Sequence, residues 1–123
     1  MITYHTKEGK FLVEKYNDIP FNKLHKEDGP AIITPLKKEW RQNGKLHRLD
    51  GPAIIRDNGQ IEWYQNGKLH RLDGPAIIWS NGDEEYLING KIIETLEVEG
   101  WIIQNNIDLK TKMGQSIFIL KFG

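Results

Sequence analysis

An internal repeat constrains the fold of this chain more than any other feature. Residues 43–55 recur identically as residues 66–78, and a weaker copy occupies residues 22–33. A truncated copy begins at Asn89, so the copies are spaced 23 residues apart, with one interval of 22. Short copies at a regular spacing are typical of arrays in which each copy packs mainly against its neighbours.

Turn sequences within each copy predict β-hairpins. Asn-Gly favours two-residue hairpin turns because such turns need positive φ at both central residues. It occurs at 43–44, 58–59, 66–67, 81–82 and 89–90, and Asp-Gly-Pro occurs at 28–30, 50–52 and 73–75. The β-rich runs between these turns are too short for helices. We therefore expect an antiparallel β-hairpin repeat meander over residues 21–94, with either three short strands per copy or two strands and an extended connector.

The segments on either side of the repeats predict two different ends. Residues 1–20 contain two β-rich runs around a turn, which predicts an N-terminal hairpin. Residues 95–123 predict a small, partly helical C-terminal cap, because Val98, Trp101 and Ile102 would share one face of a helix over residues 96–105. Residues 116–122 are compatible with either a strand or a helix. The expected fold is mainly β, in a single domain spanning residues 1–123.

Composition excludes several classes of function. The chain has no cysteine, so it can form no disulfide, thiolate nucleophile or cysteine metal site. Its 17 basic and 17 acidic residues are balanced along the chain, which argues against a nucleic-acid partner. No apolar run is long enough to span a membrane and no signal peptide is evident, so we expect a cytoplasmic protein. Common nucleotide, metal and hydrolase motifs are absent, and we expect no cofactor.

Polar residues that recur in the two identical copies are candidates for chemistry. They are His47, Arg48 and Asp50, and His70, Arg71 and Asp73. A histidine beside an aspartate can act as a general base, and an arginine can hold a phosphate. A structural role is favoured, because a catalytic site is needed only once. In that role the aspartate accepts turn N–H groups and the arginine bridges it to the next copy. The repeated histidines would not lie on adjacent strands, so we expect no metal site.

Aromatic residues suggest a packing column and a separate binding surface. Trp40, Trp63 and Tyr86 recur every 23 residues, and each follows a glutamate. A regular aromatic column predicts packing within the sheet. Tyr64 and Trp79 depart from the repeat pattern, and Arg41 and Arg56 occupy the equivalent positions in other copies. We predict that these four residues form the binding surface, because interface hot spots favour Trp, Tyr and Arg. Packing of Trp79 against the cap is the alternative.

The motif of residues 62–70, Glu-Trp-Tyr-Gln-Asn-Gly-Lys-Leu-His, resembles the MORN repeat, particularly its variant form. This resemblance implies a β-hairpin repeat sheet and a binding or scaffolding role; MORN repeats are also associated with membrane phospholipids. The chain departs from the family after His47, where Arg-Leu-Asp-Gly replaces Gly-x-Gly. The longer form, with Asp-Gly-Pro-Ala, is similar to repeats encoded by bacteriophages and large DNA viruses.

The resemblance and the residue analysis together predict a binding protein that is not an enzyme. The expected partner is another protein, and the viral resemblance implies an accessory protein that inhibits a host defence or regulatory factor. One alternative is a small-molecule or nucleotide-binding protein that uses the repeated His, Arg and Asp residues. Another alternative is a hydrolase that uses the same residues. The sequence leaves the oligomeric state open.

Overall fold

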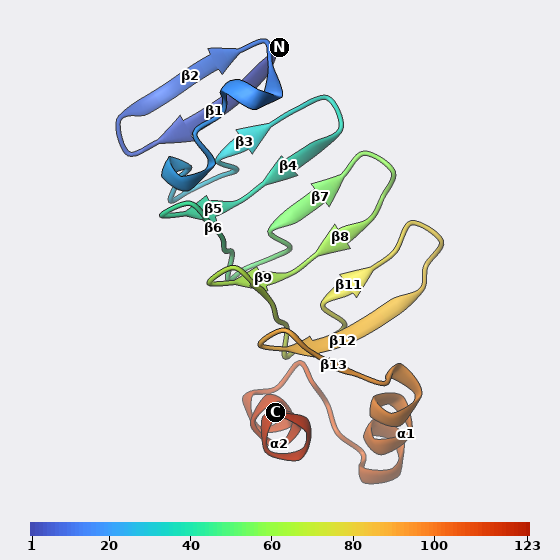
Figure 1. The fold of residues 1–123 in the computed structure, drawn as a ribbon. Coiled ribbons are helices and arrows are strands. Elements are labelled where there is room, and N and C mark those ends of the chain that lie inside the picture. Colours follow the sequence, from blue (N-terminus) through green and yellow to red (C-terminus); the bar gives the residue numbers. More distant parts are fainter.

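The computed structural model describes residues 1–123, and its fold is mainly β with two helices at the C-terminal end (Figure 1). The strands are β1 (Ile2–Thr6), β2 (Gly9–Val13), β3 (Ile32–Ile33), β4 (Lys37–Glu39), β5 (Arg41–Gln42), β6 (Lys45–Leu46), β7 (Ile54–Arg56), β8 (Ile61–Glu62), β9 (Tyr64–Gln65), β10 (Lys68–Leu69), β11 (Ile77–Ile78), β12 (Glu84–Ile88) and β13 (Lys91–Ile93). Two short 3₁₀ turns, η1 (Tyr16–Asp18) and η2 (Phe21–Lys23), precede β3. The helices are α1 (Thr95–Asn105) and α2 (Lys112–Phe122).

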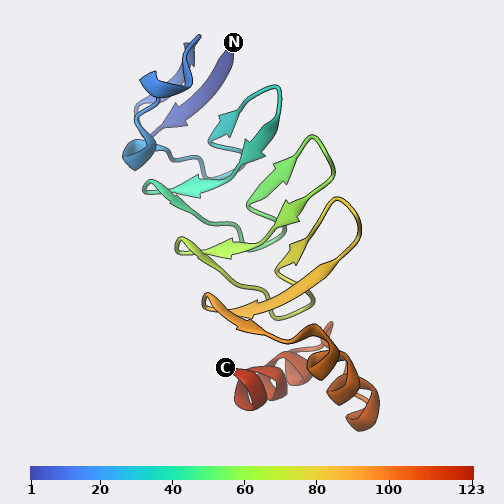
Figure 2. The ribbon, with the colours of Figure 1, turned by 45° about the vertical axis from the view of Figure 1, so that its right-hand side comes forward.

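Nine strands form one antiparallel sheet in the order β13-β12-β11-β8-β7-β4-β3-β1-β2. The hairpins lie one after another between the N-terminal hairpin β1–β2 and the two helices (Figures 1 and 2). The hairpins β5–β6 and β9–β10 form separate two-stranded pairs beside this sheet. The sequence predicted three strands per copy, or two and a connector. Residues 43–65 contain four short strands, β6 to β9, because the chain leaves the sheet at Trp63. Residues 66–88 contain three, since β12 continues without a break from Glu84 to Ile88.

The Asn-Gly turns at 43–44, 66–67 and 89–90 have the predicted backbone geometry. Both residues of each turn have positive φ, between 49° and 81°. The glycine N–H of each turn donates a 2.8 Å hydrogen bond to a leucine carbonyl of the preceding copy; the acceptors are the carbonyls of Leu24, Leu46 and Leu69. At 58–59 and 81–82 only the glycine has positive φ, so these two Asn-Gly pairs form a different type of turn. The first set of turns therefore links successive copies.

The C-terminal helices cover the apolar end of the sheet. Tyr86, Ile88 and Ile93 from β12 and β13 pack with Phe118 and Phe122 of α2 in one buried cluster. The predicted helix is confirmed as α1, and residues 116–122, which the sequence left open, are helical in α2. Neither helix is long and apolar enough to cross a membrane. A second cluster lies at the N-terminal hairpin and a third lies around Ala76, Ile77 and Leu87.

Candidate functional site

Arg48 and Arg71, from the repeated polar set, each pack between an aromatic ring and a glycine. The Arg71 guanidinium carbon lies 3.7 Å from the centroid of the Trp63 ring, and Arg48 lies 4.0 Å from that of Trp40. A Cβ atom on Gly74 would lie 2.9 Å from the guanidinium carbon of Arg71. The glycine of Asp-Gly-Pro therefore provides the space in which the arginine stacks on the aromatic column.

The same arginines hold the Asp-Gly-Pro turn of their own copy. Arg71 Nε donates to Asp73 Oδ1 at 2.6 Å, and its Nη1 donates to the Pro75 carbonyl at 3.0 Å. Arg48 repeats both hydrogen bonds, with Asp50 at 3.0 Å and the Pro52 carbonyl at 3.0 Å. From the sequence we expected the arginine to bridge the aspartate to the next copy. Its side chain instead closes a local loop, because the stack on the tryptophan directs it toward the turn that follows.

Each repeated histidine accepts a hydrogen bond from the following Asn-Gly turn. Nδ1 of His25, His47 and His70 accepts from the backbone N–H of Asn43, Asn66 and Asn89, at 3.0, 3.1 and 2.9 Å. Because Nδ1 is an acceptor, the neutral ring carries its proton on Nε2. Burial lowers the pKa of His70, which favours this neutral form. No group of three or more histidine, aspartate or glutamate side chains is placed to hold a metal ion.

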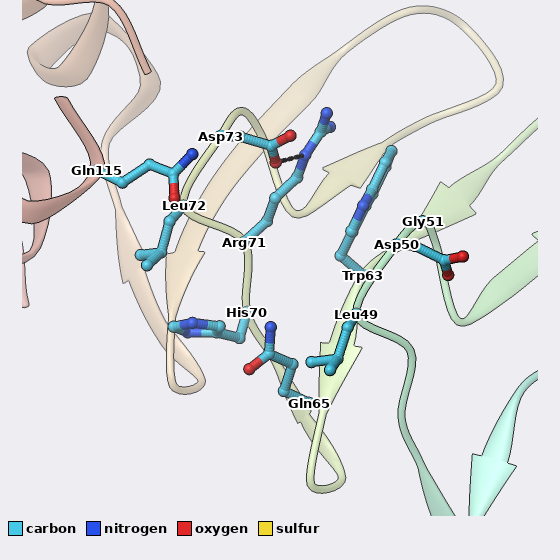
Figure 3. Close-up of a pocket in the computed structure, with 10 residues that line it drawn as sticks. All are labelled: Leu49, Asp50, Gly51, Trp63, Gln65, His70, Arg71, Leu72, Asp73 and Gln115. Carbon is cyan, nitrogen blue, oxygen red and sulfur yellow. Dashed lines mark hydrogen bonds and ion pairs between the residues drawn. The ribbon is translucent and has the colours of Figure 1, made fainter. Parts of the chain in front are cut away.

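A cavity of about 340 Å³ lies between the two identical copies and borders on the cap (Figure 3). It is lined by Leu49, Asp50, Gly51, Trp63, Gln65, His70, Arg71, Leu72, Asp73 and Gln115. Figure 3 shows Gln115 entering from α2, on the side opposite Leu49 and Asp50. The structure thus brings His70, Arg71 and Asp73 to one cavity. A hollow with the equivalent residues His47, Arg48 and Asp50 lies one copy earlier.

Glu39, Glu62 and Glu85 precede the three residues of the aromatic column, and the first two are buried, which the sequence did not indicate. We call these three residues the column glutamates. Glu39 is 1% exposed and accepts from Lys37 Nζ at 2.7 Å and from Arg41 Nε at 2.8 Å. The only sequence feature connected with this burial is that a glutamate precedes each residue of the aromatic column.

Glu62 has a different set of partners, and these include two of the predicted binding residues. Its carboxylate accepts from Arg56 Nε at 2.9 Å, from the Tyr64 hydroxyl at 3.1 Å and from Gln60 Nε2 at 3.1 Å. Burial, followed by the charge and hydrogen bond of Glu62, raises the pKa of Tyr64 to about 12. The structure therefore brings Arg56 and Tyr64 together at Glu62, whereas Arg41 forms an ion pair with Glu39.

Trp79, the fourth predicted binding residue, lies apart from these contacts. It is 39% exposed and lines a groove of about 620 Å³ between the β11–β12 turn and the beginning of α1. Leu96 and Glu99 of α1 line the same groove. Trp79 is therefore next to the cap and also accessible from solvent.

Comparison of the chain with protein families, curated proteins and solved structures finds no match. The function is therefore inferred from the contacts, burial and charges of the side chains described above.

The aromatic–arginine stack predicts that Gly74→Ala lowers the free energy of unfolding by about 2 kcal/mol, because the added methyl group displaces Arg71 from Trp63. Gly29→Ala is the matched control. Gly29 occupies the same place in the first Asp-Gly-Pro turn, but its Cβ would meet only the flexible side chain of Lys26, at 3.5 Å. Denaturant unfolding followed by tryptophan fluorescence measures both variants. If the two variants lose the same free energy of unfolding, the stack of Arg71 on Trp63 does not stabilise the fold.

Proposed function

We propose that this chain is a non-enzymatic binding protein and that its partner is another protein. One observation supports this most strongly: the candidate catalytic side chains make hydrogen bonds within the fold in both identical copies. Arg71 and Asp73 bind each other, and His70 Nδ1 is occupied by the N–H of Asn89. Such repeated internal contacts are those of a structural unit, whereas a catalytic constellation needs free groups directed at a substrate.

The proposed recognition surface includes Trp79, Tyr64, Arg41 and Arg56, with Trp79 as its main contact. Arg56 and Trp79 begin equivalent turns, since their N–H groups donate to the carbonyls of Gln60 and Asp83. These turns lie along one edge of the array (Figure 2). A large aromatic side chain that is both accessible and outside the regular aromatic column is suited to an interface hot spot.

The resemblance noted in the sequence extends this proposal. We propose that the chain is a variant MORN-like repeat protein with a 23-residue period. The viral similarity supports a bacteriophage or viral accessory protein that acts in the cytoplasm of the host cell. There it would bind and inhibit a defence or regulatory factor.

The cavity between the identical copies supports a second candidate, a small-molecule or nucleotide-binding protein. Its volume of about 340 Å³ falls within the usual range for small-ligand sites, roughly 300–1,000 Å³. Trp63, Arg71 and Gln65 would provide an aromatic surface, a cation and an amide. A hydrolase would use the same cavity.

Affinity measurements on the captured partner distinguish these candidates. The tagged chain would be used to isolate its partner from native host cells, and the purified partner would then be titrated by calorimetry. The double variant His47→Ala, His70→Ala should keep its affinity, whereas Trp79→Ala should weaken binding by more than about 1 kcal/mol, or about fivefold. Thermal melts establish that each variant is folded at the titration temperature. Selective loss of binding in the folded double variant, together with nucleotide binding by the unmodified chain, would favour the second candidate.

A further inference from the structure

Glu85 occupies the same place in the fold as the two buried column glutamates. In the hairpins of the array, Glu39 is paired with Ile32, Glu62 with Ile54, and Glu85 with Ile77. The strand of the following copy then covers the first two, because Glu39 also pairs with Ile54, and Glu62 with Ile77. Glu85 has no such following strand beside it and is only partly buried.

The partners that neutralise the first two column glutamates are replaced around Glu85. Lys37 and Arg41 lie two residues before and after Glu39, whereas Asp83 and Leu87 take these places around Glu85. Arg56 contacts Glu62, and the equivalent position in the next copy, six residues before Glu85, is occupied by Trp79. Glu85 therefore forms no ion pair, and the three side chains that could have contacted it carry no positive charge.

The groove beside Glu85 combines negative charge with exposed apolar surface. Five carboxylates line it, those of Asp83, Glu84, Glu85, Glu94 and Glu99, and its lining contains no lysine or arginine. Four apolar residues line the same groove, and three of them are exposed: Trp79, Ile92 and Leu96, which are 39%, 69% and 75% exposed. None of the five carboxylates takes part in an ion pair, although the chain as a whole has no net charge.

Both walls of the groove belong to regular elements that are tied together. The Thr95 hydroxyl, at the beginning of α1, donates to the Glu84 carbonyl of β12 at 2.8 Å. Val98 of α1 is fully buried against the cluster that contains Tyr86 and Ile93. These contacts connect α1 to β12 and β13, so the two walls of the groove are packed against each other.

We propose that this groove docks a segment of the partner protein that carries a lysine or arginine flanked by apolar side chains. The cation lies beside Glu85 and against the Trp79 ring, as Lys37 lies 2.7 Å from Glu39 and Arg56 lies 2.9 Å from Glu62 within the chain. The apolar neighbours of the cation pack on Ile92 and Leu96. This inference rests on the proposed protein-binding function and specifies the chemistry of the partner.

Two variants of the full chain test the groove with a defined probe, a short fluorescein-labelled peptide of alternating lysine and leucine. Glu85→Gln removes the proposed counter-charge. Trp79→Arg places a guanidinium at the position equivalent to Arg56, which contacts Glu62 in the preceding copy. The introduced cation should therefore pair with Glu85 and occupy the place of the partner's cation. Fluorescence anisotropy should show binding weakened by about tenfold or more in both variants, because each removes or occupies the partner of a close charge pair. Trp79→Arg should keep the melting temperature of the unmodified protein.

Controls separate specific docking from general charge attraction. Glu97→Gln removes the same charge from an exposed position on α1 that does not line the groove, and it should leave peptide affinity unchanged. The proposal is overturned if Glu97→Gln weakens binding as much as Glu85→Gln, or if the two groove variants bind normally. It is also overturned if a glutamate–leucine peptide binds equally well, or if the groove instead mediates self-association that Trp79→Arg abolishes.

The captured host partner distinguishes failure of this inference from failure of the proposed function. If Trp79→Arg binds that partner with unchanged affinity, the groove is not the docking site, although the chain remains a protein-binding protein. If host cells yield no protein partner but the peptide binds as expected, the charge preference of the groove is supported and the proposed function fails.

Discussion

Gly44→Ala should lower the free energy of unfolding by about 3 kcal/mol or more, whereas Gly67→Ala should lower it by about 1 kcal/mol. Both glycines are the second residue of an Asn-Gly turn, with φ of 79° and 80°, so alanine meets the same backbone strain at each position. Their surroundings differ. A Cβ on Gly44 would lie 2.5 Å from the Asn22 carbonyl oxygen, whereas a Cβ on Gly67 would meet only the Lys45 side chain, at 3.9 Å.

Chemical denaturation of both variants, followed by circular dichroism, measures this difference. The backbone of Asn22 cannot move away as a long side chain can, so the close contact should add to the strain at Gly44. Gly67→Ala is the control, because it reports the cost of positive φ alone. Equal losses in the two variants would show that the contact between copies adds nothing to the backbone strain.

Glu39→Ala should lower the free energy of unfolding by about 3 kcal/mol, because it leaves Lys37 and Arg41 without their buried partner. Glu85→Ala is the matched control. Glu85 has the same place in its hairpin but forms no ion pair, and its replacement should change stability by less than about 0.5 kcal/mol. Urea unfolding at neutral pH measures both variants. A similar loss in each would contradict a stabilising role for the ion pairs of Glu39.

The ionisation of the Glu39 carboxylate should determine part of how the free energy of unfolding changes in acid. Burial alone would raise the pKa of Glu39, but the hydrogen bonds and charges of Lys37 and Arg41 outweigh it and hold the pKa below its usual value of 4.5. A lowered pKa in the folded state stabilises the protein above pH 4.5, and this stabilisation is lost as the pH falls through the folded-state pKa. Unfolding measured from pH 7 downward should therefore show a shallower acid loss in Glu39→Gln. An unchanged slope would contradict this.

The hairpin turns could be predicted because their geometry depends on the residues within them. Asn43 and Asn66 have positive φ next to a glycine, as the Asn-Gly preference indicates. Residues 116–122 could not be assigned, since their β-rich composition competes with a helical spacing of the aromatic residues. In the folded protein this segment is a helix, because residues four apart share one helical face and Phe118 and Phe122 can then both pack in the cluster around Tyr86.

The candidate site was predicted only in part. Recurrence identified Arg71 and Asp73 as a structural pair, but it did not reveal that the arginine stacks on Trp63. The burial of Glu39 was missed because it depends on β7 of the following copy, which lies beside β4. A glutamate in a short polar strand gives no local indication that an adjacent strand will cover it.

The residues within each copy specify its turns and its arginine–tryptophan stack, whereas the contacts of each copy depend on the segment that packs beside it. Identical residues in 43–55 and 66–78 adopt the same turns and place their arginines on tryptophan at 4.0 and 3.7 Å. Yet the Asp50 side chain is 87% exposed, whereas that of Asp73 is 42% exposed and lies 3.5 Å from Lys110 of the cap. Turn geometry follows from backbone preferences within a few residues. Burial and charge pairing depend on which segment lies next to each copy, and the repeat alone does not specify that neighbour.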